Sequence, residues 1–147
     1  MRMLALALSL WSLIFVSSAN ADSDANKAMV TEFYEKVVAG GDIELADQFL
    51  TPGYIQHNPN VPTGRDAFKS YFAEIHDTYD IDLEILSVVG DGDMVVIHVE
   101  QTVHAAFFDI SIVAMDRFRI EDGLIAEHWD VVNGKGAFDR FILSIAQ

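Results

Sequence analysis

Two β-strands joined by a tight turn are predicted by residues 107–132, which read FFDISIVAMDRFRIEDGLIAEHWDVV. Apolar side chains recur at every second position through most of residues 107–120 and again through residues 124–132, and a period of two is typical of strands. Residues 121–123, Glu-Asp-Gly, separate the two runs, and an Asp-Gly pair favours a hairpin turn. We therefore expect an antiparallel hairpin here.

The same alternation places ionisable side chains among apolar ones. On the first strand Asp116 shares a face with four apolar residues, Ile112, Ala114, Phe118 and Ile120. On the second strand His128 and Asp130 share a face with Leu124, Ala126 and Val132. A further strand at 94–102 offers as its matching face Met94, Val96, His98 and Glu100. Burying such polar groups is costly unless they are paired or used, so we expect these faces to converge on an internal polar pocket.

Helical patterns precede the strands. Apolar residues recur with the spacing of one buried helix face in three segments, residues 29–38, 42–50 and 64–75. Gly40-Gly41 ends the first pattern and Pro52-Gly53 ends the second. From Ile81 onward the period changes to two. Helices followed by a meandering sheet indicate an α+β domain, and a strongly curved sheet wrapped on three helices would form a cone with an internal cavity.

The first residues have the pattern of a secretory signal peptide. Arg2 precedes an apolar run at 4–16, and Ala-Asn-Ala at residues 19–21 offers a cleavage site. The apolar run is shorter than the ~20 residues that a membrane span needs. We therefore expect a signal peptide at 1–21, cleavage after Ala21, and a domain at 22–147 that is exported to the periplasm or secreted.

Charge and cysteine content argue against several classes of partner and reaction. The chain of 147 residues carries 23 acidic and only 9 basic side chains, for a formal net charge of −14. Nucleic acid and anionic membranes both require Lys and Arg to neutralise phosphate, so we expect neither as a partner after signal cleavage. Cysteine is absent, which excludes disulfides and a thiol nucleophile. An apolar content of 51% suits a domain held together by its core.

Two segments carry characteristic motifs, YIQHNPNVPTGRDAF at residues 54–68 and DRFRIEDGLIAEHWD at residues 116–130. Both resemble the corresponding segments of SnoaL-like polyketide cyclases. The similarity extends over nearly all of residues 22–147. It implies the nuclear transport factor 2-like fold, an α+β cone in which three N-terminal helices pack on a strongly curved, mainly antiparallel sheet. It also implies a homodimer paired through that sheet.

The resemblance further implies a cofactor-free enzyme acting on a small apolar carbonyl compound. In the cyclases an aspartate near the end of the last strands is the acid–base group of an intramolecular aldol condensation, and Asp130 matches that place best. Such a base needs a pKa above the ~3.9 of a free carboxylate, and burial acts in that direction. His98 or His57 would then hydrogen-bond the enolate oxygen. Substrate contacts are expected from Tyr54, Asn58, Asp116 and His128.

Other functions remain open at this stage. A binding module with a pocket and no reaction is the main alternative, in which Asp130 accepts structural hydrogen bonds and Asp116 pairs with an imidazole. An enzyme resembling limonene epoxide hydrolase needs an arginine between two carboxylates, and the central strand offers only His98 and Glu100. No metal site is predicted, because no His-x-His or Glu-x-x-His spacing supports one.

Cleavage of the signal peptide gives a direct test. When the full chain is produced in a host that exports it, we expect the mature protein to begin at Asp22. Replacement Ala21→Arg should block cleavage, because the enzyme requires a small residue before the cut. N-terminal sequencing and intact mass measure both results. An exported protein that keeps residues 1–21 would contradict the prediction.

Overall fold

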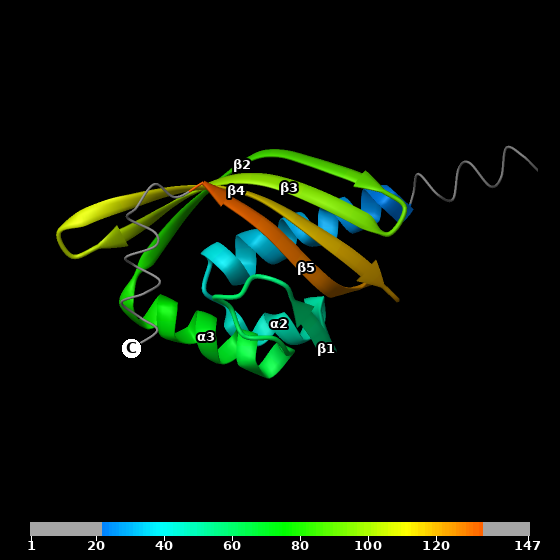
Figure 1. Ribbon diagram of the computed structural model, residues 1–147, viewed down its shortest axis with the longest axis horizontal. Coiled ribbons are helices and arrows are strands. Elements are labelled where there is room, and N and C mark those ends of the chain that lie inside the picture. The colour runs from blue at the N-terminus through cyan, green and yellow to red at the C-terminus, as the bar shows by residue number, and fades with distance from the viewer. Residues whose placement is uncertain (1–21, 134–147) are drawn as a thin grey trace, which may run out of the picture.

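Five strands form one curved sheet in the computed structural model, which describes residues 22–133 (Figure 1). The strands are β1 (Leu50–Gln56), β2 (Asp80–Asp91), β3 (Met94–Ala105), β4 (Phe108–Glu121) and β5 (Leu124–Asn133). Their order across the sheet is β1-β5-β4-β3-β2. All neighbours are antiparallel except β1, which pairs in parallel with β5. The predicted signal peptide lies outside the described residues, as do residues 134–147 of the predicted domain.

Helices cover one face of this sheet (Figure 1). The first runs through residues 22–33 and continues into the π-helix η1 (Tyr34–Ala39). A 3₁₀ turn, η2 (Ile43–Leu45), leads into α2 (Ala46–Phe49), and a longer helix, α3 (Arg65–Thr78), follows β1. Gly41 and Gly64 adopt positive φ angles of 73° and 97°, which lets the chain turn before η2 and before α3. Within the described residues, no helix is long and apolar enough to span a membrane.

Aromatic side chains join the helices to the sheet. The ring of Phe33, in the first helix, lies 5.8 Å from Phe49 and Phe68 and 6.2 Å from Phe118 on β4. Phe33 and Phe118 are almost completely buried. Under them, β3 contributes Val95, Ile97 and Val99, each with no exposed surface. Burial of this much apolar area supplies the main force that holds the cone together.

The predicted α+β cone and its hairpin are confirmed. Asp122 and Gly123 form the β4–β5 turn with φ angles of 52° and 77°, the left-handed conformation that an Asp-Gly hairpin turn requires. The face predicted for β4 is also correct, because Asp116 and Phe118 are buried whereas Arg117 is exposed. On β5, His128 is buried and Asp130 is half-buried. The hairpin therefore directs Asp116, His128 and Asp130 inward.

Two expectations about strands are wrong. A helical pattern was expected to reach residue 50 and no strand to follow it, but residues 50–56 form β1; Pro52 and Gly53 disfavour strands, but an edge strand tolerates them. On β3, the buried residues are the odd-numbered ones, so His98 and its neighbours on alternate positions lie on the outer face. Both faces of this strand begin with apolar residues, so alternation alone could not identify the inner face.

Phe118 offers a test of this packing. Replacement Phe118→Ala should lower the free energy of unfolding by roughly 3–5 kcal/mol, because it empties a buried site between the helices and β5. Urea denaturation measures the change. Phe108→Ala is the matched control, since Phe108 is 61% exposed, and it should have little effect. A loss below about 1 kcal/mol for Phe118→Ala would contradict the packing described above.

Candidate functional site

A cavity of about 120 Å³ lies between the sheet and the helices. It is large enough for several waters or a small organic molecule. Most of its wall is apolar and aromatic, including Phe33, Phe68, Phe72 and Phe118. Its ionisable side chains are Asp116, His128, Asp130 and three tyrosines, Tyr34, Tyr54 and Tyr71. The cavity thus combines an apolar body with a small number of polar groups, the usual composition of a small-molecule site.

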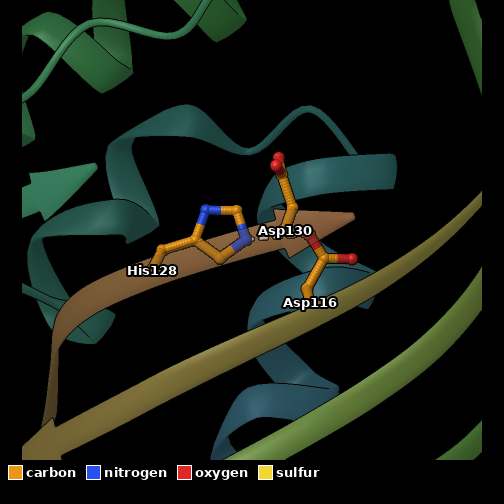
Figure 2. Close-up of side chains that lie close together, drawn as sticks. All are labelled: Asp116, His128 and Asp130. Carbon is orange, nitrogen blue, oxygen red and sulfur yellow. Dashed lines mark hydrogen bonds and ion pairs between the residues drawn. The ribbon is translucent and has the colours of Figure 1, made fainter. Parts of the chain in front are cut away.

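Three ionisable side chains from the hairpin meet at this cavity. Asp116 on β4 and Asp130 on β5 are paired directly across the strands, and His128 lies two residues before Asp130 on the same face. One carboxylate oxygen of each aspartate and one ring nitrogen of His128 all lie within 4.8 Å of one another. Figure 2 shows the three side chains projecting from the two strands on one side of the sheet. Strand register therefore creates the cluster.

His128 is held by a hydrogen bond and a ring contact. Its Nε2 lies 2.8 Å from Asp116 Oδ1, and both side chains are buried. Its ring stacks on Phe118 with centroids 4.5 Å apart. Together these contacts fix the plane of the imidazole and direct its other nitrogen toward β1.

Gln56 determines which nitrogen of His128 carries the proton. The backbone N–H of Asn58 donates to Gln56 Oε1 at 3.0 Å, which places the amide Nε2 toward His128. Gln56 Nε2 lies 2.8 Å from His128 Nδ1 and donates to it. Because Nδ1 accepts this bond, the proton of the ring lies on Nε2 and is donated to Asp116. A proton on Nδ1 would set two donors face to face.

Asn58 orients Asp130 in a similar way. Asn58 Nδ2 donates to Asp130 Oδ2 at 2.6 Å, and Asn58 Oδ1 accepts from the backbone N–H of Asn60 at 2.8 Å. The second bond fixes the amide so that its NH₂ faces the carboxylate. Asp130 Oδ1 has no hydrogen-bond partner among the described residues, which leaves it available to a ligand in the cavity.

Two buried tyrosines contribute hydroxyl groups. Burial raises the pKa of Tyr34 well above its ordinary value, and the nearby Asp116 carboxylate raises it further through its charge and through a side-chain hydrogen bond. Burial also raises the pKa of Tyr54, with smaller effects from Asp116 and Asp130. Both hydroxyls therefore stay protonated at neutral pH. Tyr54 accepts a bond from Gln56 Nε2 at 3.2 Å, so its own proton is free for another acceptor.

One atom at the polar end is fully buried and has no hydrogen-bond partner among the described residues. Asp116 is 4% exposed, and its Oδ2 has no hydrogen-bond partner among the described residues. No lysine or arginine of residues 22–133 lines the cavity. Two carboxylates therefore face the same small space, and residues 22–133 place no fixed positive charge beside them.

Asp116, His128 and Asp130 are also close enough together to bind one metal ion. However, each nitrogen of His128 already takes part in a hydrogen bond, to Asp116 and to Gln56. A metal would have to displace one of these partners before it could bind the imidazole. The arrangement consequently fits hydrogen-bonded side chains better than a set of ligands prepared for a metal.

His98 and His57 do not join the cluster. His98 pairs with Met115 on the outer face of the sheet, so its expected place in the cavity is wrong. His57 stacks on Trp129 at 4.5 Å, and its Nε2 lies 3.0 Å from Glu127 Oε2. Neither histidine lines the cavity. By contrast, the expected substrate-contact residues Tyr54, Asn58, Asp116 and His128 all do.

Sequence reasoning missed Gln56 and Tyr34. Gln56 lies on β1 with Tyr54, and the period of two would have placed both on one face had that strand been recognised. Tyr34 belongs to the apolar stripe of the first helix and was expected only in the core. Its type gives no signal that its hydroxyl approaches Asp116.

Solved structures with this fold include proteins of several activities. TsrD from Streptomyces laurentii is 28% identical, with a TM-score of 0.64 over 73% of this chain and 90% of its own. A candidate polyketide cyclase from Acidithiobacillus ferrooxidans is 20% identical, with a TM-score of 0.69 over 79% and 93%. An epoxide hydrolase of the LEH-like type from M. tuberculosis is 14% identical, with a TM-score of 0.69 over 85% and 98%. The last two likenesses establish the fold alone.

The sequence itself identifies the family. A search of curated proteins finds no match to this chain. The profile of the SnoaL-like domain matches residues 30–128, a span from the first helix to His128 on β5. That span includes most of the cavity wall and two members of the cluster. The chain belongs to the SnoaL-like family.

Proposed function

We propose that this protein is an exported enzyme that carries out cofactor-free acid–base chemistry on a small carbonyl compound, with Asp130 as the base. The observation that carries the proposal is the convergence of Asp116, His128 and Asp130 at one end of an otherwise aromatic cavity. Membership of the SnoaL-like family and the fold shared with a candidate polyketide cyclase support the same chemistry. Aldol condensation and cyclisation are the reactions that best suit such a site.

Asp130 is the best-placed base. Asn58 holds one of its oxygens at 2.6 Å, and the other is available to take a proton from a carbon next to a carbonyl group. Asp116 is less suited to this role, because it is more deeply buried and already accepts the Nε2 proton of His128. Asp116 and His128 would instead position the substrate beside the base.

The negative charge of an enolate requires a hydrogen-bond donor. Tyr54 is the first choice, since its hydroxyl accepts from Gln56 and keeps its own proton for the substrate oxygen. Burial raises the pKa of Tyr54, so this proton is retained at neutral pH. A hydrogen-bond donor in a largely dry site lowers the barrier to enolate formation by about 3 kcal/mol. This role replaces the one expected for His98 or His57.

Epoxide hydrolysis is the second candidate. Asp116 and Asp130 face one cavity; one, as the carboxylate, would take a proton from water, and the other, in its protonated form, would donate a proton to the epoxide oxygen. Against it, no arginine of the described residues lines the cavity between them. Solvent oxygen incorporated into a diol product would favour this candidate over the carbon-acid reaction.

Export and dimer formation are part of the proposal. The outer face of the sheet exposes apolar side chains at its centre, among them Met115 on β4 and Val131 on β5. Such a patch supports pairing through the sheet, the arrangement expected from the family resemblance. A homodimer would leave the cavity, on the opposite face, open to substrate.

Hydrogen–deuterium exchange at carbon tests the proposed base. In D₂O, the wild-type protein should exchange the acidic C–H of small 1,3-dicarbonyl compounds, and Asp130→Asn should slow this by about 10²–10⁴-fold because the proton acceptor is lost. Proton NMR of the compound measures the rate. Asp122→Asn, on the exposed β4–β5 turn, is the control and should exchange normally. Equal rates for wild type and Asp130→Asn would exclude Asp130 as the base.

Nitrogen-15 NMR tests the role of His128. We expect an unprotonated Nδ1 and a protonated Nε2, because Gln56 donates to the first and Asp116 accepts from the second. His104 is the internal reference: hydrogen bonds to Asp82 and Asp109 raise its pKa, so both of its nitrogens stay protonated to higher pH than in an unperturbed histidine. A proton on Nδ1 of His128 near neutral pH would contradict the assigned network.

A further inference from the structure

The polar end of the cavity contains two carboxylates, and no lysine or arginine of residues 22–133 lines it. Asp116 Oδ2 is buried and has no hydrogen-bond partner among the described residues. Asp130 is its cross-strand partner, and its carboxylate lies within 4.8 Å of the rest of the cluster. A buried acceptor without a donor is destabilising, and two carboxylates in one small space repel each other. The Tyr34 hydroxyl lies near Asp116 as a donor but carries no charge, so the repulsion between the two carboxylates is left for a cationic ligand to relieve.

No side chain of residues 22–133 supplies a fixed positive charge there. Arg117, on the outer face of β4, lies 4.2 Å from the ring of Trp129. Arg119 pairs with Glu121 and Glu127. His128 offers Asp116 one N–H, and its other nitrogen accepts from Gln56. Within residues 22–133, therefore, no cation balances the two carboxylates, and a cationic ligand in the cavity would do so.

The walls beside the carboxylates are aromatic. Tyr34 and Phe118 lie with ring centroids 6.0 Å apart, and both line the cavity near Asp116. The faces of aromatic rings attract cations, and their apolar surface suits a hydrocarbon group. Carboxylates together with aromatic walls favour an organic ammonium ion over a hydrated inorganic one.

We infer that the cavity binds a small primary amine in its protonated form, with the ammonium group donating to Asp116 Oδ2 and to Asp130 and the hydrocarbon part against Phe68 and Phe72. Asp130 Oδ1 has no partner among the described residues and is thus free to accept the second bond. A metal ion is disfavoured by the two hydrogen bonds that occupy His128. This inference concerns ligand recognition and does not depend on Asp130 acting as a base.

Three ligands of similar shape and different charge provide the test. Benzylamine, benzyl alcohol and benzoate share an aromatic ring and differ in the group that would meet the carboxylates. Calorimetric titration at neutral pH should show that wild-type protein binds benzylamine about tenfold more tightly than benzyl alcohol, the difference between a charge-assisted and a neutral hydrogen bond. Benzoate should bind most weakly of the three.

Two variants test whether the carboxylates of the cavity cause the preference for benzylamine. Asp116→Asn keeps an acceptor for His128 Nε2 and removes the charge, so it should abolish the preference for benzylamine over benzyl alcohol. Glu84→Gln is the matched control, because it removes one negative charge from an exposed position on β2 and should leave the preference unchanged. If Asp116→Asn does not fold, Asp130→Asn, at a half-buried position, should still reduce the preference.

Several results would overturn the inference. Equal affinity for benzylamine and benzyl alcohol would show that the carboxylates do not select a cation. If the preference for benzylamine persists in Asp116→Asn, or falls equally in Glu84→Gln, the overall charge of the protein causes it and the carboxylates of the cavity do not. Tight binding of Zn²⁺ or Mg²⁺ by the wild type, with no binding of benzylamine, would identify a metal site instead. If the wild-type protein prefers benzylamine but catalyses no hydrogen–deuterium exchange at carbon, the proposed function is refuted and this inference stands.

Discussion

The register of the β4–β5 hairpin is the constraint on which the site depends. It pairs Asp116 with Asp130 across two strands and places His128 on the same inner face. A shift of β5 by one residue would turn His128 and Asp130 to the outer face and leave Asp116 alone on the inner one, because successive residues of a strand point to opposite sides. The buried stack of Phe118 on His128 also depends on this register. The apolar contacts that stabilise the sheet thus position its ionisable groups as well.

The parallel edge strand β1 completes what the hairpin begins. It pairs with β5 so that Gln56 lies beside His128, and the chain that follows brings Asn58 to Asp130. Each amide is held by a backbone N–H, so its orientation does not depend on a ligand. The site is therefore ordered before anything binds, and a ligand would meet preset donors and acceptors.

Much of this arrangement could be predicted from sequence where one face of a strand differs clearly from the other. Asp116, His128 and Asp130 stood among apolar residues at a period of two, and the structure brings them together. His98 was misplaced because Met94, Val95, Val96 and Ile97 make both faces of β3 apolar at its start. Gln56 was missed because Pro52 and Gly53 hide an edge strand. Contacts such as that of Tyr34 with its surroundings depend on tertiary packing, which no local pattern encodes.

The central claim is that Asp116 and Asp130 share one small space and influence each other. A double-mutant cycle of Asp116→Asn and Asp130→Asn, read as free energies of unfolding at neutral pH, measures that influence most directly. The two substitutions should be non-additive by about 0.5–3 kcal/mol, because removing either charge relieves the same repulsion. Effects that add to within about 0.3 kcal/mol would show that the two carboxylates act independently, and that the cavity does not contain a single coupled site.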